Sequence, residues 1–194
     1  MPVGATPVRG FNHIVVRHSL PVGLVLIPFL LGAVDPGAAS PGASLLSALP
    51  PRWRDDSGHE LLLADFHGRR VIMTMAYTSC RKICPITFLR LKEMQSELDS
   101  RGEAAEFVVV GYDPDTDDTG AWRQYRETRK LMRTNWHFVT GTNDDTERLA
   151  RLLGFEFWKY DNHVMHDFRI VIFDATGALH ASLDSSRADW KETL

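Results

Sequence analysis

Two short stretches of this chain are apolar on both faces, and each is followed by a helical pattern. They are RVIMTMAY (70–77) and EFVVVGY (106–112). A strand whose successive side chains are all apolar is buried on both sides, which in an open sheet requires helices on both faces. This feature predicts an α/β fold in which the central strands are parallel and are connected by helical crossovers.

The pattern on either side extends this alternation along the chain. Strands are expected at 60–66 and 136–141, and helices over 85–101, around Trp122, Tyr125 and Leu131, and from Asn143 to about Gly154. The segments FRIVIFD and ALHASL, joined by residues 175–177, predict a hairpin. The predicted fold class is therefore α/β, with a mostly parallel sheet flanked by helices and closed by an antiparallel hairpin.

Residues 1–39 have the three parts of an export signal. Arg9 and Arg17 make the start basic, residues 19–34 carry no charge, and small residues lead up to Ala39, a suitable cleavage point. The uncharged stretch is shorter than the ~20 residues that a spanning helix needs. We therefore expect a signal peptide, with an uncleaved membrane anchor through residues 19–34 as the alternative.

The rest of the chain is expected to hold one domain. Residues 40–57 are rich in Pro, Gly and Ser and are expected to be a linker, which leaves residues 58–194 as the folded domain. The formal net charge of −3, with no long run of Lys or Arg, gives no reason to expect a nucleic acid as partner. Two cysteines cannot form the framework of a small disulfide-rich protein.

The only two cysteines, Cys80 and Cys84, lie between a buried strand and the helix that follows it. Ligand chemistry gathers at the carboxyl ends of strands in such sheets, and four-residue spacing brings side chains together in a helical loop. The helix N-terminus and the adjacent Arg81 and Lys82 favour the thiolate, which binds metals and attacks disulfides. The alternatives are a structural disulfide, which would close only a very short loop, and two inert buried thiols.

A metal would need a further ligand, and His166 is the candidate. It is expected to open the strand FRIVIF, where a thioredoxin-like sheet would place it opposite the N-terminus of the first helix. Two thiolates and one imidazole suit copper, as Cu(I) or Cu(II). Zinc bound by Cys80, Cys84, His163 and His166 is the competing arrangement.

Taken together, these motifs resemble the Sco/SenC family. Four segments match, and they occur in the family's order: YTSCRKICP, DPDTDDT, WHFVTG and HDFRIVIFDATG. Together they cover roughly residues 60–180. The resemblance implies a thioredoxin-like fold with copper bound by Cys80, Cys84 and His166. It also implies that Asp113 begins an acidic loop near the metal.

The resemblance further implies a copper metallochaperone of the cell envelope that assists assembly of the copper site of cytochrome c oxidase. Its partners would be the oxidase subunit that carries this site, other copper carriers, or thiol reductants. Its location would be the periplasm or the outer face of the inner membrane, or the mitochondrial inner membrane in a eukaryote. The alternatives are a thiol–disulfide reductase that uses Cys80 and Cys84 as a redox pair, and a copper or redox sensor.

The chain departs from the family pattern at three places. Many members have proline where Arg81 stands and aspartate where Met165 stands. After the acidic loop the family has Asp-Thr-Pro, whereas this chain has Asp117-Asp118-Thr119 and lacks the proline. Because Arg81 and Met165 are next to expected ligands, these departures bear on metal affinity and thiol potential more than on the fold.

Overall fold

The computed structural model describes residues 44–161 and 163–194. The predicted signal peptide or anchor (1–39, with its apolar part at 19–34) lies outside the described residues. Among the residues that are described, no helix combines the length and the apolar character that crossing a membrane requires.

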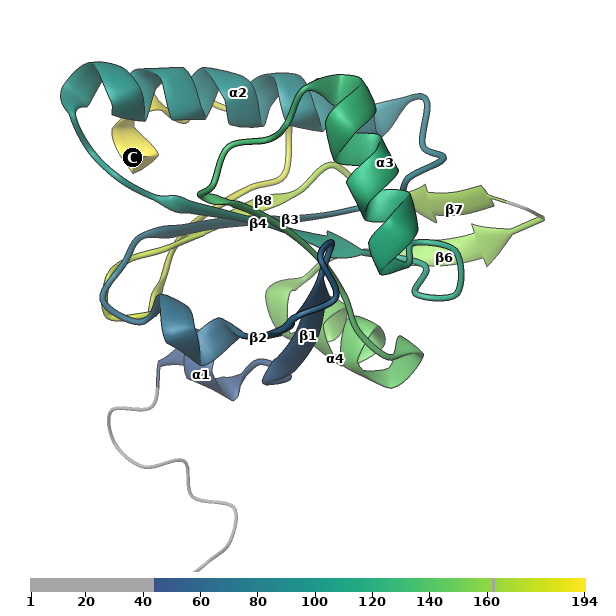
Figure 1. Ribbon diagram of the computed structural model, residues 1–194. Helices are drawn as coiled ribbons and strands as arrows, with labels where there is room; N and C mark the ends of the chain where they lie inside the picture. The colour runs from purple at the N-terminus through teal and green to yellow at the C-terminus, as the bar shows by residue number, and fades with distance from the viewer. Residues whose placement is uncertain (1–43, 162) are drawn as a thin grey trace, which may run out of the picture. The chain divides into compact units, whose positions relative to one another are not determined.

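A seven-stranded sheet forms the centre of the domain, with strand order β2-β1-β5-β4-β3-β8-β9 (Figure 1). The strands are β1 (Arg52–Asp55), β2 (Glu60–Leu62), β3 (Val71–Ala76), β4 (Glu106–Gly111), β5 (Trp136–Thr140), β8 (Ile170–Phe173) and β9 (Leu179–Leu183). The central strands β3, β4 and β5 are parallel, and the pairs outside them are antiparallel. The predicted α/β class with a parallel centre and a closing hairpin is confirmed, and β1 and β2 add a second antiparallel edge.

Helices cover both faces of this sheet, which is why β3 and β4 are apolar at nearly every position. The helices are α1 (Leu45–Ala48), α2 (Ile83–Arg101), α3 (Thr119–Arg129) and α4 (Asn143–Leu153), with 3₁₀ turns η1 (Leu63–Phe66) and η2 (Lys191–Thr193). Figure 1 shows α2 and α3 on one face and α1 and α4 on the other. The two long helix patterns end as predicted, because Gly102 and Gly154 adopt left-handed backbone conformations (φ 67° and 73°) that stop α2 and α4.

The prediction that residues 40–57 are a linker was wrong, because from residue 45 this segment contains α1 and β1. Leu46 and Trp53 are each only 1% exposed, and β1 pairs with β5 through Arg54 and Thr140. The Trp53 ring packs so closely on Gly141 that a Cβ there would lie 2.6 Å from a ring carbon. Pro50 and Pro51 separate α1 from β1, both of which belong to the core, and the folded part begins before residue 58.

Two other local predictions were wrong. Residues 60–66 were predicted as one strand, but only Glu60–Leu62 is extended and the rest forms η1. The second difference is a separate antiparallel hairpin of β6 (Phe157–Tyr160) and β7 (His163–His166). His166 therefore ends β7 and does not open β8. The hairpin lies near the N-terminal end of α2 (Figure 1).

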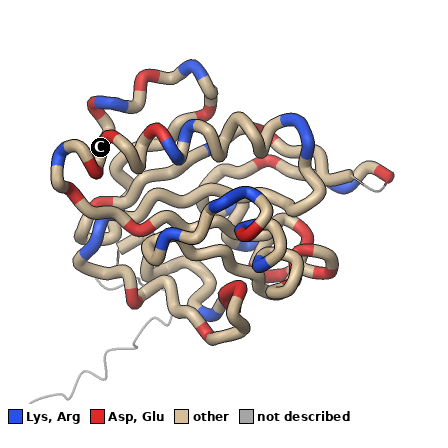
Figure 2. The backbone as a smooth tube through the Cα atoms, turned by 45° about the horizontal axis from the view of Figure 1, so that its top comes forward, with Lys and Arg blue, Asp and Glu red and all other residues tan. Residues whose placement is uncertain are grey.

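Charged residues of both signs are interspersed along the described chain (Figure 2). Local pairs, more than a long-range field, therefore set the electrostatics of the domain. The most buried of these pairs joins Asp56, after β1, to Arg126 of α3, with carboxylate–guanidinium distances of 2.6 and 2.8 Å. This ion pair connects the edge of the sheet formed by β1 and β2 to helix α3.

Candidate metal centre

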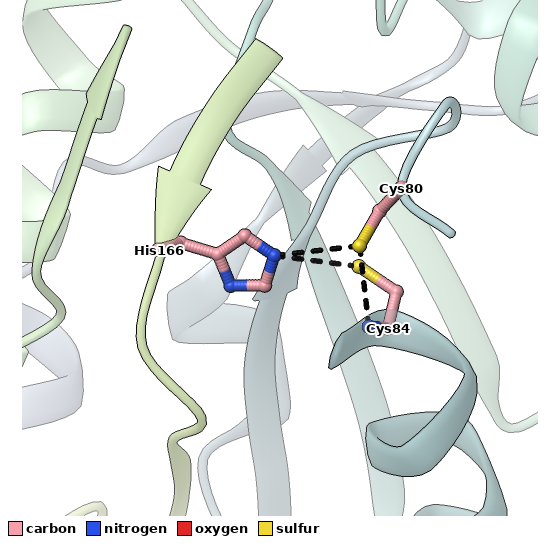
Figure 3. A group of neighbouring side chains, drawn as sticks. All are labelled: Cys80, Cys84 and His166. Atoms are coloured by element: carbon pink, nitrogen blue, oxygen red, sulfur yellow. Dashed lines mark hydrogen bonds between the residues drawn. The ribbon is translucent and has the colours of Figure 1, made fainter. Parts of the chain in front are cut away.

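Cys80, Cys84 and His166 converge although they lie far apart in the chain (Figure 3). The Sγ atoms of Cys80 and Cys84 are 3.5 and 3.7 Å from Nε2 of His166. The three ligand atoms all lie within 4.8 Å of one another. A metal that bonds to sulfur at about 2.3 Å and to nitrogen at about 2.0 Å fits among donors at this separation. The structure therefore brings together the three residues that the sequence singled out.

The cysteines are placed by the junction between β3 and α2. Cys80 follows β3 in a turn in which its N–H donates to the carbonyl of Tyr77 (3.1 Å). Cys84 lies in the first turn of α2, and its backbone N–H donates to Sγ of Cys80 at 3.2 Å. This N–H is one of the amides that a helix N-terminus leaves free, so the helix itself stabilises negative charge on Cys80. Pro85 fits the same turn because it needs no amide hydrogen there.

His166 is held in one orientation before any metal binds. Its Nδ1 lies 2.7 Å from the backbone carbonyl oxygen of Asp167, which can only accept a hydrogen bond. Nδ1 therefore carries the proton, and the lone pair of Nε2 faces the two sulfur atoms. The ring packs against Tyr112 (centroids 4.8 Å apart) and edge-on against Tyr77 (5.6 Å). Backbone and aromatic contacts thus present the imidazole as a ready ligand.

The two thiols share one proton. The Cys84 thiol donates a hydrogen bond to Cys80, and the backbone N–H groups of Cys84 and Lys82 add to it, so that the pKa of Cys80 falls well below its usual value. The same bond to the Cys80 thiolate, together with burial, raises the pKa of Cys84. At neutral pH the pair is therefore a Cys80 thiolate beside a Cys84 thiol.

The sequence predicted that the positive charges of Arg81 and Lys82 favour the Cys80 thiolate. Both side chains are exposed, and neither is among the causes of the lowered pKa of Cys80. Hydrogen bonds lower the pKa of Cys80, first from the Cys84 thiol, and Lys82 takes part only through its backbone N–H. The charge state of the pair is therefore set by the geometry of the turn.

The competing zinc arrangement required His163 as a fourth ligand. His163 and His166 are three residues apart on β7, so they project to opposite faces of the strand. His163 is exposed, and among the described residues the group of His, Cys, Asp and Glu that could hold a metal here contains only Cys80, Cys84 and His166. The structure therefore offers three donors and leaves a side open.

The acidic loop after β4 connects the two halves of the site. Asp117 is fully buried and accepts hydrogen bonds from the N–H and hydroxyl of Thr78 (2.7 and 2.8 Å) and from the N–H of Asp113 (3.1 Å). Asp113 in turn accepts from Lys159 of β6 at 2.6 Å. The resemblance to the family implied a place near the metal for Asp113 alone. Asp117, which ties this loop to the residue two positions before Cys80, was missed.

A hollow of about 330 Å³ leads from solvent to the centre. Buried Cys80 and half-buried His166 line it, together with the exposed residues Arg81, His163 and Met165. A bound metal is therefore within reach of a partner's ligands, and metal transfer by ligand exchange is sterically possible.

The SCO1/SenC family model matches residues 52–192. No curated protein matched. A putative electron transfer protein from Aquifex aeolicus is 20% identical (TM-score 0.66), with 73% of this chain and 84% of that one covered. Arabidopsis thaliana ScoI with copper bound is 18% identical (TM-score 0.65; 74% and 90% covered), and yeast Sco1 with copper bound is 20% identical (0.64; 74% and 82%). The chain therefore belongs to the SCO1/SenC family.

Proposed function

We propose that this protein is a copper metallochaperone of the cell envelope that assists assembly of the copper site of cytochrome c oxidase. The observation that carries the proposal is the convergence of two cysteine sulfurs on the free nitrogen of His166. Soft thiolates bind Cu(I), and imidazole extends the range to Cu(II). Membership of the SCO1/SenC family and the copper bound to the two similar structures support it.

Copper is the cargo in this proposal, and the chain's own groups account for its capture and release. The Cys80 thiolate attracts the ion, His166 already presents its lone pair, and Cys84 loses its proton to solvent as its sulfur binds. Since one side of the three donors opens into the hollow, a recipient's ligands can replace them one at a time. The proposed recipient is the oxidase subunit that carries the copper site, and thiol reductants would keep the cysteine pair reduced.

The proposed location is the periplasm or the outer face of the inner membrane, or the mitochondrial inner membrane in a eukaryote. The amino-terminal sequence supports it, since it has the form of an export signal or anchor.

The test is a Cu(II) titration of the reduced full chain, followed by absorption and electron spin resonance. We expect one ion per chain with thiolate-to-copper charge transfer, and loss of this signal in Cys80→Ser. His166→Ala is expected to weaken binding strongly. The matched control is His180→Ala, because His180 is exposed and lies outside the three-residue group. Full wild-type affinity in His166→Ala would overturn the site assignment.

A thiol–disulfide reductase is the second candidate, and the unequal thiols favour it. The Cys80 thiolate would attack a partner disulfide and form a mixed disulfide. Cys84 would then lose its proton and attack that bond, which releases the reduced partner and leaves Cys80 and Cys84 joined. This chemistry does not need the imidazole as a metal ligand. Turnover of a disulfide substrate by metal-free protein at the same rate in His166→Ala would favour the reductase.

A further inference from the structure

The outer face of the β6–β7 hairpin, defined here as Trp158, Tyr160, His163 and Met165, is exposed. Trp158 pairs with Met165 and Tyr160 with His163 across the two strands, so alternation places all four side chains on one face. Trp158 is 56% exposed, Tyr160 65% and Met165 44%, and His163 is exposed as well. The metal ligand His166 belongs to the opposite face.

Packing does not explain this face. The other four tryptophans of the chain are buried, with exposures of 6% or less (Trp53, Trp122, Trp136 and Trp190). Trp158 and Met165 are 56% and 44% exposed, so neither side chain fills a core position. An imidazole, a thioether and an indole that lie together in solvent instead form a set of groups that bind soft cations.

We propose that His163 and Met165 form a second, weaker Cu(I) site at the entrance to the metal centre. The two residues are two positions apart on one strand face, about 7 Å along the strand. The unbranched methionine side chain can move its sulfur toward the imidazole. Trp158, opposite Met165, would add the attraction of its ring for a cation.

The weakness of this site suits a transient role. A thioether and an imidazole bring no negative charge, and the exposed cations Arg81 and Lys82 line the same hollow and disfavour a bound cation. The thiolates of the inner centre bind Cu(I) more strongly than a thioether and an imidazole do. An ion held at the outer face is therefore expected to move inward.

The hollow connects the two sites, because His163 and Met165 line it together with Cys80 and His166. Transfer would be ligand exchange without a redox step. The Cys80 thiolate replaces the Met165 thioether on Cu(I), the Cys84 sulfur then replaces the His163 imidazole, and the proton of Cys84 leaves to solvent. This direction of transfer rests on the proposed function, whereas binding at the outer face does not.

The test uses the reduced full chain and Ag(I), which is a redox-inert substitute for Cu(I). After one equivalent of Ag(I), a second equivalent is expected to quench the emission of exposed Trp158 and shift the methyl resonance of Met165. Met165→Leu and His163→Gln should each weaken the second binding event at least about tenfold, since even the loss of a residue that only supports a metal ligand costs this much. The first binding event should not change.

Met132→Leu is the matched control, because Met132 is 55% exposed and lies beyond the end of α3. Equal binding of the second ion in Met165→Leu, Met132→Leu and wild type would overturn the proposal. The outcome is separable from that of the main site. If Cys80→Ser loses the tight ion but keeps quenching of Trp158 that depends on Met165, the outer site stands whatever the inner site does.

Discussion

Replacing the buried carboxylate of Asp117 with the amide of asparagine tests how the acidic loop holds the metal centre. Asp117 is fully buried and accepts three hydrogen bonds, two from Thr78 and one from Asp113. These bonds favour the ionised form, but the loss of hydration disfavours it. Burial is the larger effect and raises the pKa of Asp117 from 3.8 to about 6.

The sign of the pH dependence follows from this rise in the pKa of Asp117. Between about pH 4 and pH 6 the folded chain keeps the Asp117 proton that the unfolded chain has lost, so the stability contributed by this proton falls as pH rises. At roughly 1.4 kcal/mol per pKa unit, the loss is about 3 kcal/mol and is complete above the folded pKa. Asp117→Asn cannot ionise and lacks this term.

The assay is urea unfolding of reduced wild type and Asp117→Asn at a series of pH values between about 4 and 7. The wild-type free energy of unfolding minus that of the variant should fall by about 2.4 kcal/mol across this range, because part of the total change lies below pH 4. Taking the difference removes the contributions of other carboxylates, which are common to both proteins. A difference that stays flat or rises with pH would refute the reasoning, because the hydrogen bonds would then outweigh burial.

Three further predictions concern other parts of the fold. Gly177→Ala should destabilise the protein roughly 1 kcal/mol more than Gly68→Ala in thermal unfolding. Both glycines have positive φ, but only at Gly177 would a Cβ meet a neighbour, the hydroxyl oxygen of Ser44 at 2.5 Å. Equal losses of stability in the two variants would contradict this. Asp56→Ala leaves buried Arg126 unpaired and should cost about 3–5 kcal/mol in urea unfolding; a loss below about 1 kcal/mol would show that the pair is solvated. In reduced, metal-free protein, the ultraviolet absorption of one thiolate should persist down to about pH 5, because hydrogen bonds lower the pKa of Cys80, and titration of both thiols near their ordinary value would contradict it.

The centre of the fold could be predicted because burial on both faces leaves a direct mark on the sequence. β3 and β4 are apolar at nearly every position, and the glycines that end α2 and α4 are visible as letters. The cysteine pair could be placed for the same reason, since it lies where a buried strand meets a helix. Strand β1 could not be predicted, because its four residues alternate between exposed and buried and follow two prolines. Only its pairing with β5 shows that they form a strand.

The hairpin that presents His166 could not be predicted, although His166 itself could. Each of its strands has four residues, and most of the side chains in β6 and half of those in β7 are exposed, so no apolar period distinguishes them. A two-stranded hairpin is at best marginally stable by itself. Tertiary contacts hold this one, through the ring of Phe157 against Tyr112 and the ion pair of Lys159 with Asp113. Contacts of this kind join residues distant in sequence.

Arg81 and Met165, where this chain departs from the family pattern, lie away from the contacts that hold the ligands. Arg81 and Met165 are exposed and line the hollow, whereas the hydrogen bonds that set the thiolate and the imidazole come from Cys84 and the backbone. Substitution at either position therefore leaves the ligands and their orientation intact and changes what an approaching ion or partner meets. Since the outer face of the hairpin has no core to fill, its residues can vary while the hydrogen bonds of the inner centre stay the same.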